Sequence, residues 1–545
     1  MRRRLLFSIV ALAIGASLLA AAGLASPASS NSPSAKNSTA KKGGTLRINV
    51  SDSDVDYIDP GLSYYVPGWA LLYTTCRQLL NYPDKAAPAG TRLFPDGAVA
   101  MPRISRNGRT LTFKVRKSMK FSNGKALTAA NYAAAIDRVA DPKFGSPAVA
   151  FASDIVGFDA VNAGRGSHVS GVTTKGNTIT IRLTAAHVDF LSRLAMMFFC
   201  PVPKGTPRPA AGTIVPGSGP YYVSSRTPGR TIVLKRNKNY KGPRPHNANE
   251  MDVTVNTNQD TSLLQVQRGS ADYDLGGHPG TADAGLSQKY GLNKKQYFVS
   301  PQISTNYFAM NNSRGVFKGV AARKAVNYAI DRTSLIKTQG KFAGKPTDQL
   351  LPPKLAGYRP ANLFPNRPNV SKAKRLLAGK KPTVDWYEGG SDIRKARAAA
   401  AQAQLKRVGI DVKIHGFGTG VMYKKCGTRG EAFDICDVGW VADYVDPFDF
   451  VDVLLNGNNI QASNNNNYAY FNNAKYNRRM NAANKLSGPK RYKAYGNLDV
   501  DISKNAAPNA YWINFNNRDF ISSKTGCYTF QPVYASPDFT ILCRK

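Results

Sequence analysis

An acidic side chain between two large aromatic residues is the first candidate for chemistry in this sequence. Asp443 lies three residues after Trp440 and directly before Tyr444, within the run FDICDVGWVADYVDPFDF at 433–450. Aromatic neighbours remove water from a carboxylate, and a desolvated carboxylate needs a cation close by. If the protein does not provide that cation, a ligand can. Taken alone, the run also fits a buried strand that ends at the Asp446-Pro447 turn, with Asp443 as a capping or surface residue.

Residues for nucleophilic or metal-dependent catalysis are not grouped in this sequence. The five histidines are isolated from one another: His168, His187, His246, His278 and His415. No H-E-x-x-H, no G-x-S-x-G, no phosphate loop and no dinucleotide fingerprint is present. We therefore expect no cofactor, no metal site and no enzyme activity. A secreted hydrolase that uses two carboxylates stays open as an alternative, although no pair of acids is marked by its spacing.

The charge of the chain is strongly positive. Its 545 residues contain 74 Lys and Arg against 34 Asp and Glu, a formal net charge of +40. The basic residues are scattered through every segment and do not form one arm or helix, and no zinc-finger or RNA-binding aromatic motif accompanies them. We therefore do not expect nucleic acid as a partner. A solvated basic surface that faces anionic polymers of the cell envelope fits this distribution better.

The amino terminus has the pattern of an export signal. Three arginines at 2–4 precede an apolar run at 5–24, and small residues follow. This pattern predicts a signal peptide at 1–25 and a Ser/Pro/Ala-rich flexible tether at 26–42. The apolar run is nearly as long as a membrane span, so an uncleaved anchor stays open. No cysteine follows it directly, which argues against a lipoprotein anchor.

The chain has six cysteines, an even number that favours disulfides in an exported protein. None lies in a C-x-x-C pair, and six cysteines allow fifteen connectivities. The preferred bridges are those that close short loops, which gives Cys426–Cys436 and Cys527–Cys543 and leaves Cys76–Cys200.

Hydrophobic periodicity predicts a mixed α/β protein of two or three lobes. Alternating strands are predicted at 45–50, 109–116, 177–183 and 251–256, and an apolar strand at 307–312. Helices are predicted at 128–139, 261–268 and 319–337. From residue 371 a helix, a strand (383–387), an Ala-rich helix (392–408) and another strand (410–414) follow one another. This order is typical of a lobe with a mixed or parallel sheet.

The order of several short blocks resembles the extracellular solute-binding proteins of family 5, the oligopeptide, dipeptide and nickel-binding group of ABC importers. The blocks are KGGTL at 42–46, IDP at 58–60, GRTLTFKVRK at 108–117, MKFSNGK at 119–125, GSGPY at 217–221, RNKNY at 236–240, AVNYAIDR at 325–332 and WVADYVDP at 440–447. Each block is weak by itself, but their shared order over most of the chain is specific. The chain departs from the family in its missing lipobox cysteine, its basic character and Ser218, where threonine is common.

The resemblance implies an α/β, two-lobe clamshell of the type II periplasmic-binding-protein kind, with an extra module inserted in lobe one. Lobe one would comprise 43–80, 213–303 and 510–545, with the module at 81–212 and lobe two at 304–509. The resemblance also implies a monomer that captures a peptide between the lobes and passes it to an ABC permease in the membrane. Other solutes on this scaffold, such as a metal chelate, an opine or a sugar derivative, stay open.

In peptide-binding members of the family, the acid of the W-x-A-D-Y block pairs with the α-ammonium group of the ligand, and Asp443 stands at that position. Trp440 and Tyr444 would then line the cleft. Tyr64 and Tyr65, in the loop after the first strand, are further cleft candidates. With 74 basic residues, the sequence does not select a partner for a ligand carboxylate.

Overall fold

The computed structural model describes residues 42–51, 55–207 and 213–545. The predicted signal peptide and all of the tether except Lys42 lie outside these residues. No helix within the described ranges is long and apolar enough to cross a membrane. The described residues all lie within one compact unit.

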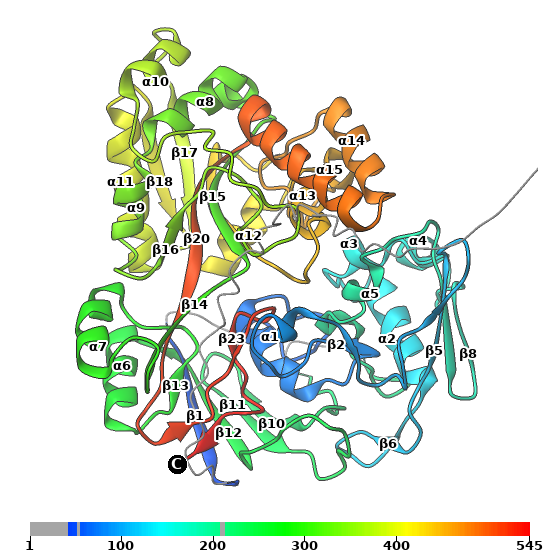
Figure 1. Ribbon diagram of the computed structural model, residues 1–545. Helices are drawn as coiled ribbons and strands as arrows, with labels where there is room; N and C mark the ends of the chain where they lie inside the picture. Colours follow the sequence, from blue (N-terminus) through cyan, green and yellow to red (C-terminus); the bar gives the residue numbers. More distant parts are fainter. Residues whose placement is uncertain (1–41, 52–54, 208–212) are drawn as a thin grey trace, which may run out of the picture. The chain divides into compact units, whose positions relative to one another are not determined.

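A five-stranded sheet, here called the first sheet, contains strands from distant parts of the sequence (Figure 1). Its order is β10 (Tyr221–Thr227), β11 (Thr231–Arg236), β12 (Glu250–Thr257), β1 (Thr45–Ser51) and β13 (Tyr273–Asp274). β1 runs parallel to β12, with Thr45 opposite Glu250. The apolar residues Leu46, Ile48 and Val50 of β1 are buried in one core with α1 (Val66–Leu72) and the chain end, as their period-two spacing predicts.

A seven-stranded sheet, the second sheet, lies farther along the chain. Its order is β14 (Tyr297–Pro301), β20 (Asn509–Phe520), β15 (Ser304–Met310), β19 (Ile435–Val441), β17 (Thr383–Glu388) and β18 (Asp411–Gly416), and β16 (Gly344–Pro346) pairs with β20. Helices that share its core are α8 (Val320–Ala329), α9 (Arg332–Lys337), α10 (Val370–Leu377) and α11 (Asp392–Lys406). Four more helices are α12 (Thr419–Cys426), α13 (Phe448–Leu455), α14 (Ala474–Asn484) and α15 (Gly488–Asp501).

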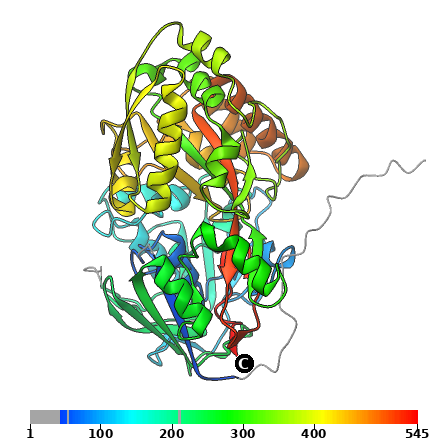
Figure 2. The same ribbon diagram turned by 90° about the vertical axis from the view of Figure 1, so that its left-hand side faces the viewer.

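The longest strand, β20, continues from one group of strands to another (Figure 2). Its first half pairs with β15 and β16, and its second half pairs with β14. Directly after β20, Ile521 forms a bridge with Tyr273 of the first sheet. β20 therefore connects the two sheets through its backbone, and the predicted boundary at residue 510 stays a prediction.

Residues 81–207, here called the inserted segment after the module predicted at 81–212, have a small sheet of their own. Its order is β4 (Arg103–Ile104), β5 (Thr110–Lys114), β9 (Thr178–Arg182) and β8 (Val172–Lys175), with α2 (Ala129–Ala140) against it. The capping box between Thr128 and Asn131 starts α2 where the sequence predicts a Thr cap. Short elements in the segment are β6 (Met119–Lys120), β7 (Ala126–Leu127), α3 (Val149–Ala152), α4 (Phe158–Asn162) and α5 (Phe190–Arg193), and β2 (Leu80–Asn81) pairs with β3 (Phe94–Pro95).

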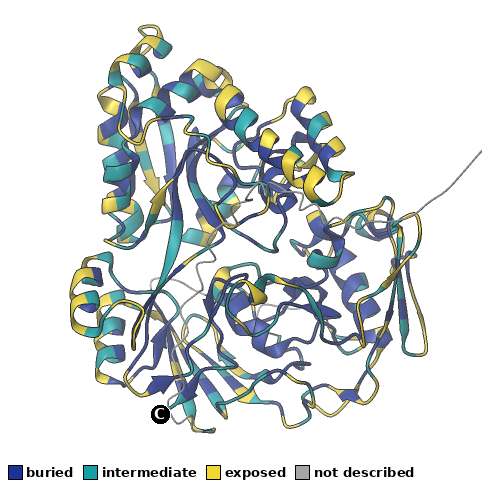
Figure 3. Cartoon of the chain, viewed as in Figure 1, coloured by how far each residue is buried: buried dark blue, intermediate teal, exposed yellow. Residues whose placement is uncertain are grey.

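The remaining elements border the first sheet and the chain end. They are α6 (Gln259–Arg268), α7 (Asp283–Tyr290), β21 (Thr525–Gly526), β22 (Phe530–Gln531), β23 (Ser536–Pro537) and β24 (Cys543–Arg544). Figure 3 shows that buried residues line the inner faces of both sheets, whereas exposed residues lie on the outer helices.

The prediction of one helix over 319–337 is wrong, because the chain forms α8 and α9 with a break between them. Ile330 is extended, and the Asp331 carboxylate accepts a hydrogen bond from the Ser334 N–H at 2.9 Å. A side chain that caps a new helix offers the backbone an alternative to continuing the first one. The apolar spacing continues across this break, so periodicity alone does not reveal it.

All six cysteines are paired, in the connectivity that the sequence favours: Cys76–Cys200, Cys426–Cys436 and Cys527–Cys543. Cys76–Cys200 joins the residues after α1 to the inserted segment. Cys426–Cys436 joins the end of α12 to β19, and Cys527–Cys543 closes the carboxyl-terminal turn region.

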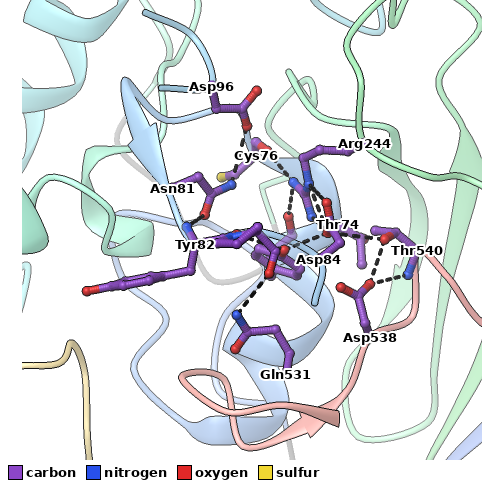
Figure 4. A network of polar contacts seen from close by, with 12 residues as sticks. Thr74, Cys76, Asn81, Tyr82, Asp84, Asp96, Arg244, Gln531, Asp538 and Thr540 are labelled. Carbon is purple, nitrogen blue, oxygen red and sulfur yellow. Dashed lines mark hydrogen bonds and ion pairs between the residues drawn. The ribbon is translucent and has the colours of Figure 1, made fainter. Parts of the chain in front are cut away.

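A buried polar network attaches the end of the chain to the region after α1 (Figure 4). Arg244 pairs with Asp84 at 3.0 Å and donates to the carbonyl oxygens of Tyr73 and Cys76. The Thr540 hydroxyl donates to Asp84 at 3.2 Å. Because these groups are buried, their mutual pairing is needed to offset the desolvation of their charges.

Candidate functional site

Asp443 lies in the short loop between β19 and α13, and its side chain is half-buried. Its Oδ2 accepts a hydrogen bond from the Tyr64 hydroxyl at 2.8 Å. Its own N–H donates to Oδ2 of Asp449 at 2.9 Å. The structure thus brings together Asp443 and Tyr64, two predicted site residues that are 379 positions apart in sequence.

Tyr64 is positioned by a carboxylate in its own loop. Oδ2 of Asp56 accepts from the backbone N–H groups of Tyr64 and Tyr65, at 2.6 and 3.1 Å, and Oδ1 accepts from the Ser63 hydroxyl. Burial raises the pKa of Asp56, although these hydrogen bonds act in the opposite direction. The three bonds fix the loop, which presents the Tyr64 side chain to Asp443.

Aromatic rings surround the Tyr64–Asp443 contact. The centroid of the Tyr64 ring lies 6.3 Å from that of Trp440 in β19, 5.3 Å from Phe198 and 5.8 Å from Trp69. The indole N–H of Trp440 donates to Asp449 at 3.3 Å, and Trp440 is 7% exposed. Rings from the loop after β1, from the inserted segment and from the second sheet therefore meet around one carboxylate.

Tyr444 is fully buried and makes its contacts with the inserted segment. Its hydroxyl donates to Oδ2 of Asp189, in the inserted segment, at 3.0 Å. Its ring lies edge-on to Phe151 of the same segment, with centroids 6.5 Å apart. In this arrangement Tyr444 joins the β19–α13 loop to the inserted segment, and its predicted contact with a ligand stays a prediction.

Two arginines complete this contact with the inserted segment. Asp189 pairs with Arg193 at 2.7 Å and lies 3.6 Å from Arg491 of α15. Arg491 also pairs with Asp446 at 2.8 Å, and the Arg193 guanidinium lies 4.4 Å from the centre of the Phe448 ring. The chain itself therefore supplies cations to Asp189 and Asp446.

Tyr65 faces a different pair of rings. Its centroid is 6.4 Å from Tyr423 in α12, which lies 5.8 Å from Tyr468. A Cβ atom on Gly420, at the start of α12, would lie 2.7 Å from the Tyr65 hydroxyl oxygen. A side chain at position 420 would therefore require the Tyr65 ring to shift.

The electrostatic environment of Asp443 differs from that of its acidic neighbours. Burial raises the pKa of Asp443 to about 7, while the hydrogen bonds from Tyr64 and Asp449 lower it in part. Burial next to Asp443 raises the pKa of Asp449 well above its usual range. No Lys, Arg or His of the described residues forms an ion pair with Asp443. The site is a desolvated carboxyl pair without a cation.

Three residues near the site were not selected by sequence reasoning: Asp449, Tyr468 and Arg394. Of these three, Asp449 could have been found most easily from the sequence. It lies six residues after Asp443 in the first turn of α13, and an acid at that position can reach the loop before the helix. Tyr468 is 8% exposed and is influenced by the charge of Asp443. Arg394, in the first turn of α11, donates to the Asp437 carbonyl at 3.1 Å and bonds with Tyr423.

Away from Asp443, groups of metal ligands and cavities are the other features that could form a site. Within the described ranges, no group of three or more His, Cys, Asp or Glu could hold a metal ion. Two surface cavities of about 440 and 460 Å³ lie elsewhere, one beside α9 and the other along 346–366. Neither is lined by Asp443 or its ring cluster.

Two sheets connected by one long strand and its following residue, with a desolvated carboxyl pair among rings from separate parts of the chain, fit a two-lobe solute-binding protein. The model of the bacterial extracellular solute-binding proteins, family 5, matches residues 93–462. The chain belongs to this family, which confirms the resemblance found in its sequence.

Individual relatives are distant. The dipeptide-binding protein DppE of Bacillus subtilis is 24% identical over 433 residues, which cover 75% of this chain and 77% of DppE. A structure of the murein tripeptide binding protein MppA of Escherichia coli has a TM-score of 0.80 at 21% identity, covering 93% of this chain and 99% of that one. The predicted fold class, an α/β two-lobe clamshell, is confirmed.

A second structure of the same protein, the unliganded open form of MppA, has a TM-score of 0.66 with this chain at 22% identity, covering 94% of this chain and 99% of that one.

Proposed function

We propose that this protein captures peptides with a free amino terminus and that Asp443 is the anchor for their α-ammonium group. The single observation that carries the proposal is the carboxyl pair of Asp443 and Asp449, which is desolvated and has no cationic partner among the described residues. The neighbouring acids Asp446 and Asp189 are paired with arginines, so the lack of a cation distinguishes the Asp443–Asp449 pair from these two acids.

The physical chemistry of the site is sufficient for useful affinity. A hydrogen bond to a charged group contributes about 1.5–3 kcal/mol, and a micromolar dissociation constant corresponds to about −8 kcal/mol in total. An ammonium anchor together with several main-chain hydrogen bonds reaches this value. Such a site would select the peptide terminus more than the peptide side chains.

The names of relatives support a peptide over other solutes. The B. subtilis relative is a dipeptide-binding protein, and the E. coli relative binds a murein tripeptide. We extend this ligand class to the present chain. The family consists of binding proteins, and we propose a role without catalysis, in which the ligand is released unchanged.

Delivery to an ABC permease in the membrane and export by the signal peptide at 1–25 belong to the same proposal. The family is described as extracellular, which supports the export. We propose that the lobes close around the ligand by a hinge motion and that the closed monomer docks on the permease.

The test is calorimetric titration of Asp443→Ala and Asp443→Asn with a mixture of short peptides and with the same peptides after amino-terminal acetylation. The wild-type protein should bind the free peptides and bind the acetylated ones at least tenfold more weakly. Both variants should lose binding of the free peptides.

An affinity of either variant within twofold of the wild type would show that Asp443 is not the anchor. Equal binding of free and acetylated peptides by the wild type would contradict the ammonium anchor. Mass spectrometry of solutes that copurify with the wild type identifies the ligand, and finding a non-peptide solute would contradict the proposed class.

A further inference from the structure

Asp449 is a fully buried acid in the first turn of α13, and no cation is paired with it within the described part of the chain. One of its oxygens, Oδ2, accepts two hydrogen bonds, from the Asp443 N–H at 2.9 Å and from the Trp440 indole N–H at 3.3 Å. The other oxygen, Oδ1, is buried, and no donor of the described residues reaches it. The two oxygens of this carboxyl group therefore have different environments.

This asymmetry indicates where a proton would be. An ionised carboxylate needs donors at both oxygens when it is buried, because an unsatisfied charged oxygen is destabilising. A neutral carboxylic acid has a carbonyl oxygen, which accepts hydrogen bonds, and a hydroxyl group, which donates one. Oδ2 has the environment of a carbonyl oxygen, and Oδ1 has that of a hydroxyl. The Asp443 carboxyl lies within hydrogen-bond reach of Asp449 and can accept this bond.

We infer that Asp449 is a neutral carboxylic acid that donates a hydrogen bond to Asp443 and so makes Asp443 the single anion of the ligand cleft. Asp443 then receives two O–H donors, from Tyr64 and from Asp449. Asp449 acts on Asp443 and on the loop backbone, so it is a positioning residue. This inference deepens the proposed function and rests on it only where ligand binding is concerned.

The groups around the pair favour one negative charge over two. The titratable residues whose charge is felt by Asp443 or Asp449 are Tyr64, Tyr82, Tyr444, Asp446 and Tyr468. None of these is a cation, and the two nearby arginines, Arg193 and Arg491, pair with Asp189 and Asp446. Two ionised carboxylates so close together without a cation would repel each other strongly, which agrees with the raised pKa of Asp449.

The consequence is a match of charge between site and ligand. A single anion balances one ammonium group, whereas two carboxylates would favour a divalent cation or a doubly charged amine. The retained proton on Asp449 thus selects a monovalent cationic end. Below about pH 7, where Asp443 is itself protonated, binding of the ammonium group breaks the Asp443 O–H bond and releases that proton to water.

The direct test is infrared spectroscopy of the ligand-free protein at pH 8, with Asp449→Asn as the difference reference. Wild type should have the carbonyl band of a buried neutral carboxylic acid, which shifts when the solvent is exchanged for heavy water, and the variant should lack it. The absence of such a band would overturn the inference. This measurement needs no ligand, so its failure is separate from a failure of the proposed function.

The second test compares two substitutions of the same residue. Asp449→Asn keeps a carbonyl acceptor for the two N–H groups and an N–H donor for Asp443, so peptide affinity at pH 8 should stay within about threefold of the wild type. Asp449→Leu removes both and should weaken binding at least tenfold. A loss of tenfold or more in Asp449→Asn would show instead that Asp449 binds as a second anion.

The pH profile of binding separates positioning from a purely structural role. Asp449→Leu removes the donor that stabilises ionised Asp443, so the midpoint of the affinity profile should move to higher pH by about one unit, whereas Asp449→Asn should leave it near pH 7. An unchanged midpoint in a folded Asp449→Leu protein would contradict the inference. If no peptide binds to the wild type, the infrared result still decides the protonation of Asp449.

Discussion

At the scale of single residues, only a few polar groups of the described chain reach the Asp443 carboxylate. Its side chain accepts from Tyr64 and lies against Asp449, and both act while water is largely excluded. The Tyr64 hydroxyl should therefore contribute to ligand binding in addition to the packing of the Tyr64 ring. A peptide ammonium group would join an anion that already has two donors in place.

Replacing Tyr64 by phenylalanine removes one donor to Asp443 and keeps the ring against Trp440 and Phe198. We expect peptide affinity to fall at least tenfold, because a hydrogen bond to a charged group contributes about 1.5–3 kcal/mol. Calorimetric titration measures the change. Tyr476→Phe, which removes a hydroxyl bonded to Asp501 in α14 and α15, is the matched control and should bind like the wild type. Equal losses in the two variants would contradict a specific role for Tyr64.

The pH dependence of binding follows from the raised pKa of Asp443, about 7. Below this value a proton competes with the ammonium group for the same carboxylate. Peptide affinity should therefore fall about tenfold for each pH unit below 7 and be nearly constant from pH 7.5 to 9. Titrations at pH 5.5, 6.5 and 8 measure this profile. A constant affinity over that range would show that the bound state does not require ionised Asp443.

At the scale of elements, β19, which contains Trp440 and leads into Asp443, is held in place by its neighbours. It lies between β15 and β17 in the second sheet, and Cys436 within it is bonded to Cys426 at the end of α12. The following helix, α13, is buried along its length and has Asp449 and Asp452 in its interior. Strand, disulfide and helix together leave the Asp443 loop little freedom.

Removal of the Cys426–Cys436 disulfide tests whether this restraint on β19 is needed for stability and ligand binding. The double variant Cys426→Ser/Cys436→Ser should lose about 2–3 kcal/mol of unfolding free energy, since the closed loop is short. Peptide affinity should fall as well, because α12 carries Tyr423 next to Tyr65. Denaturant unfolding and titration measure the two effects. The control Cys527→Ser/Cys543→Ser should lose stability and keep affinity. The same loss of affinity in the control would contradict a local restraint on β19.

Asp452 in α13 gives a pH-dependent contribution to stability. Burial raises its pKa to about 7, although hydrogen bonds from Tyr495 and Asn456 lower it in part. Between about pH 4 and pH 7 the folded protein keeps a proton that the unfolded chain releases, so this contribution decreases as pH rises. From pH 5 to pH 8 the wild type should lose more unfolding free energy than Asp452→Asn. Parallel stability curves of the two proteins would show that Asp452 does not titrate in this range.

Sequence patterns predicted the elements better than the site. Alternation in β1 and the capping of α2 are local, so short-range spacing is sufficient to find them. The Tyr64–Asp443 bond joins positions 379 residues apart, and only the family resemblance connected them beforehand. The side-chain direction of Tyr444, which bonds to Asp189, depends on packing between separate segments. Spacing within one segment carries no information on such contacts.

At the scale of the whole described unit, the contact between the inserted segment and the β19–α13 loop is polar and buried. Tyr444, Asp446 and Arg491 meet Asp189 and Arg193, so all charges are paired across the contact. A contact of this kind stabilises one relative position of the two parts, because separating them leaves charges to be rehydrated. We therefore expect it to influence how easily the ligand cleft opens.

Tyr444→Phe tests this influence, because it removes the bond to Asp189 and keeps the ring against Phe151. The closed arrangement should lose about 1 kcal/mol, which weakens peptide affinity about fivefold when closure is required for binding. Small-angle scattering of the ligand-free variant should give a larger radius of gyration than the wild type. The control Tyr221→Phe removes a buried hydrogen bond from the hydroxyl to the Ala248 carbonyl, next to the first sheet. It should leave the radius of gyration and the peptide affinity unchanged. An unchanged radius and affinity in Tyr444→Phe would contradict the role of this contact.

The place of β20 in the second sheet also has a consequence for biosynthesis. β20 lies between β14 and β15, yet it is completed only at residue 520 of 545. During translation, strands β14 to β19 emerge without the neighbour that should separate β14 from β15, and contacts of such long sequence separation form late. Until β20 has been synthesised, the second sheet is incomplete. The nascent chain should therefore remain incompletely folded until β20 has left the ribosome.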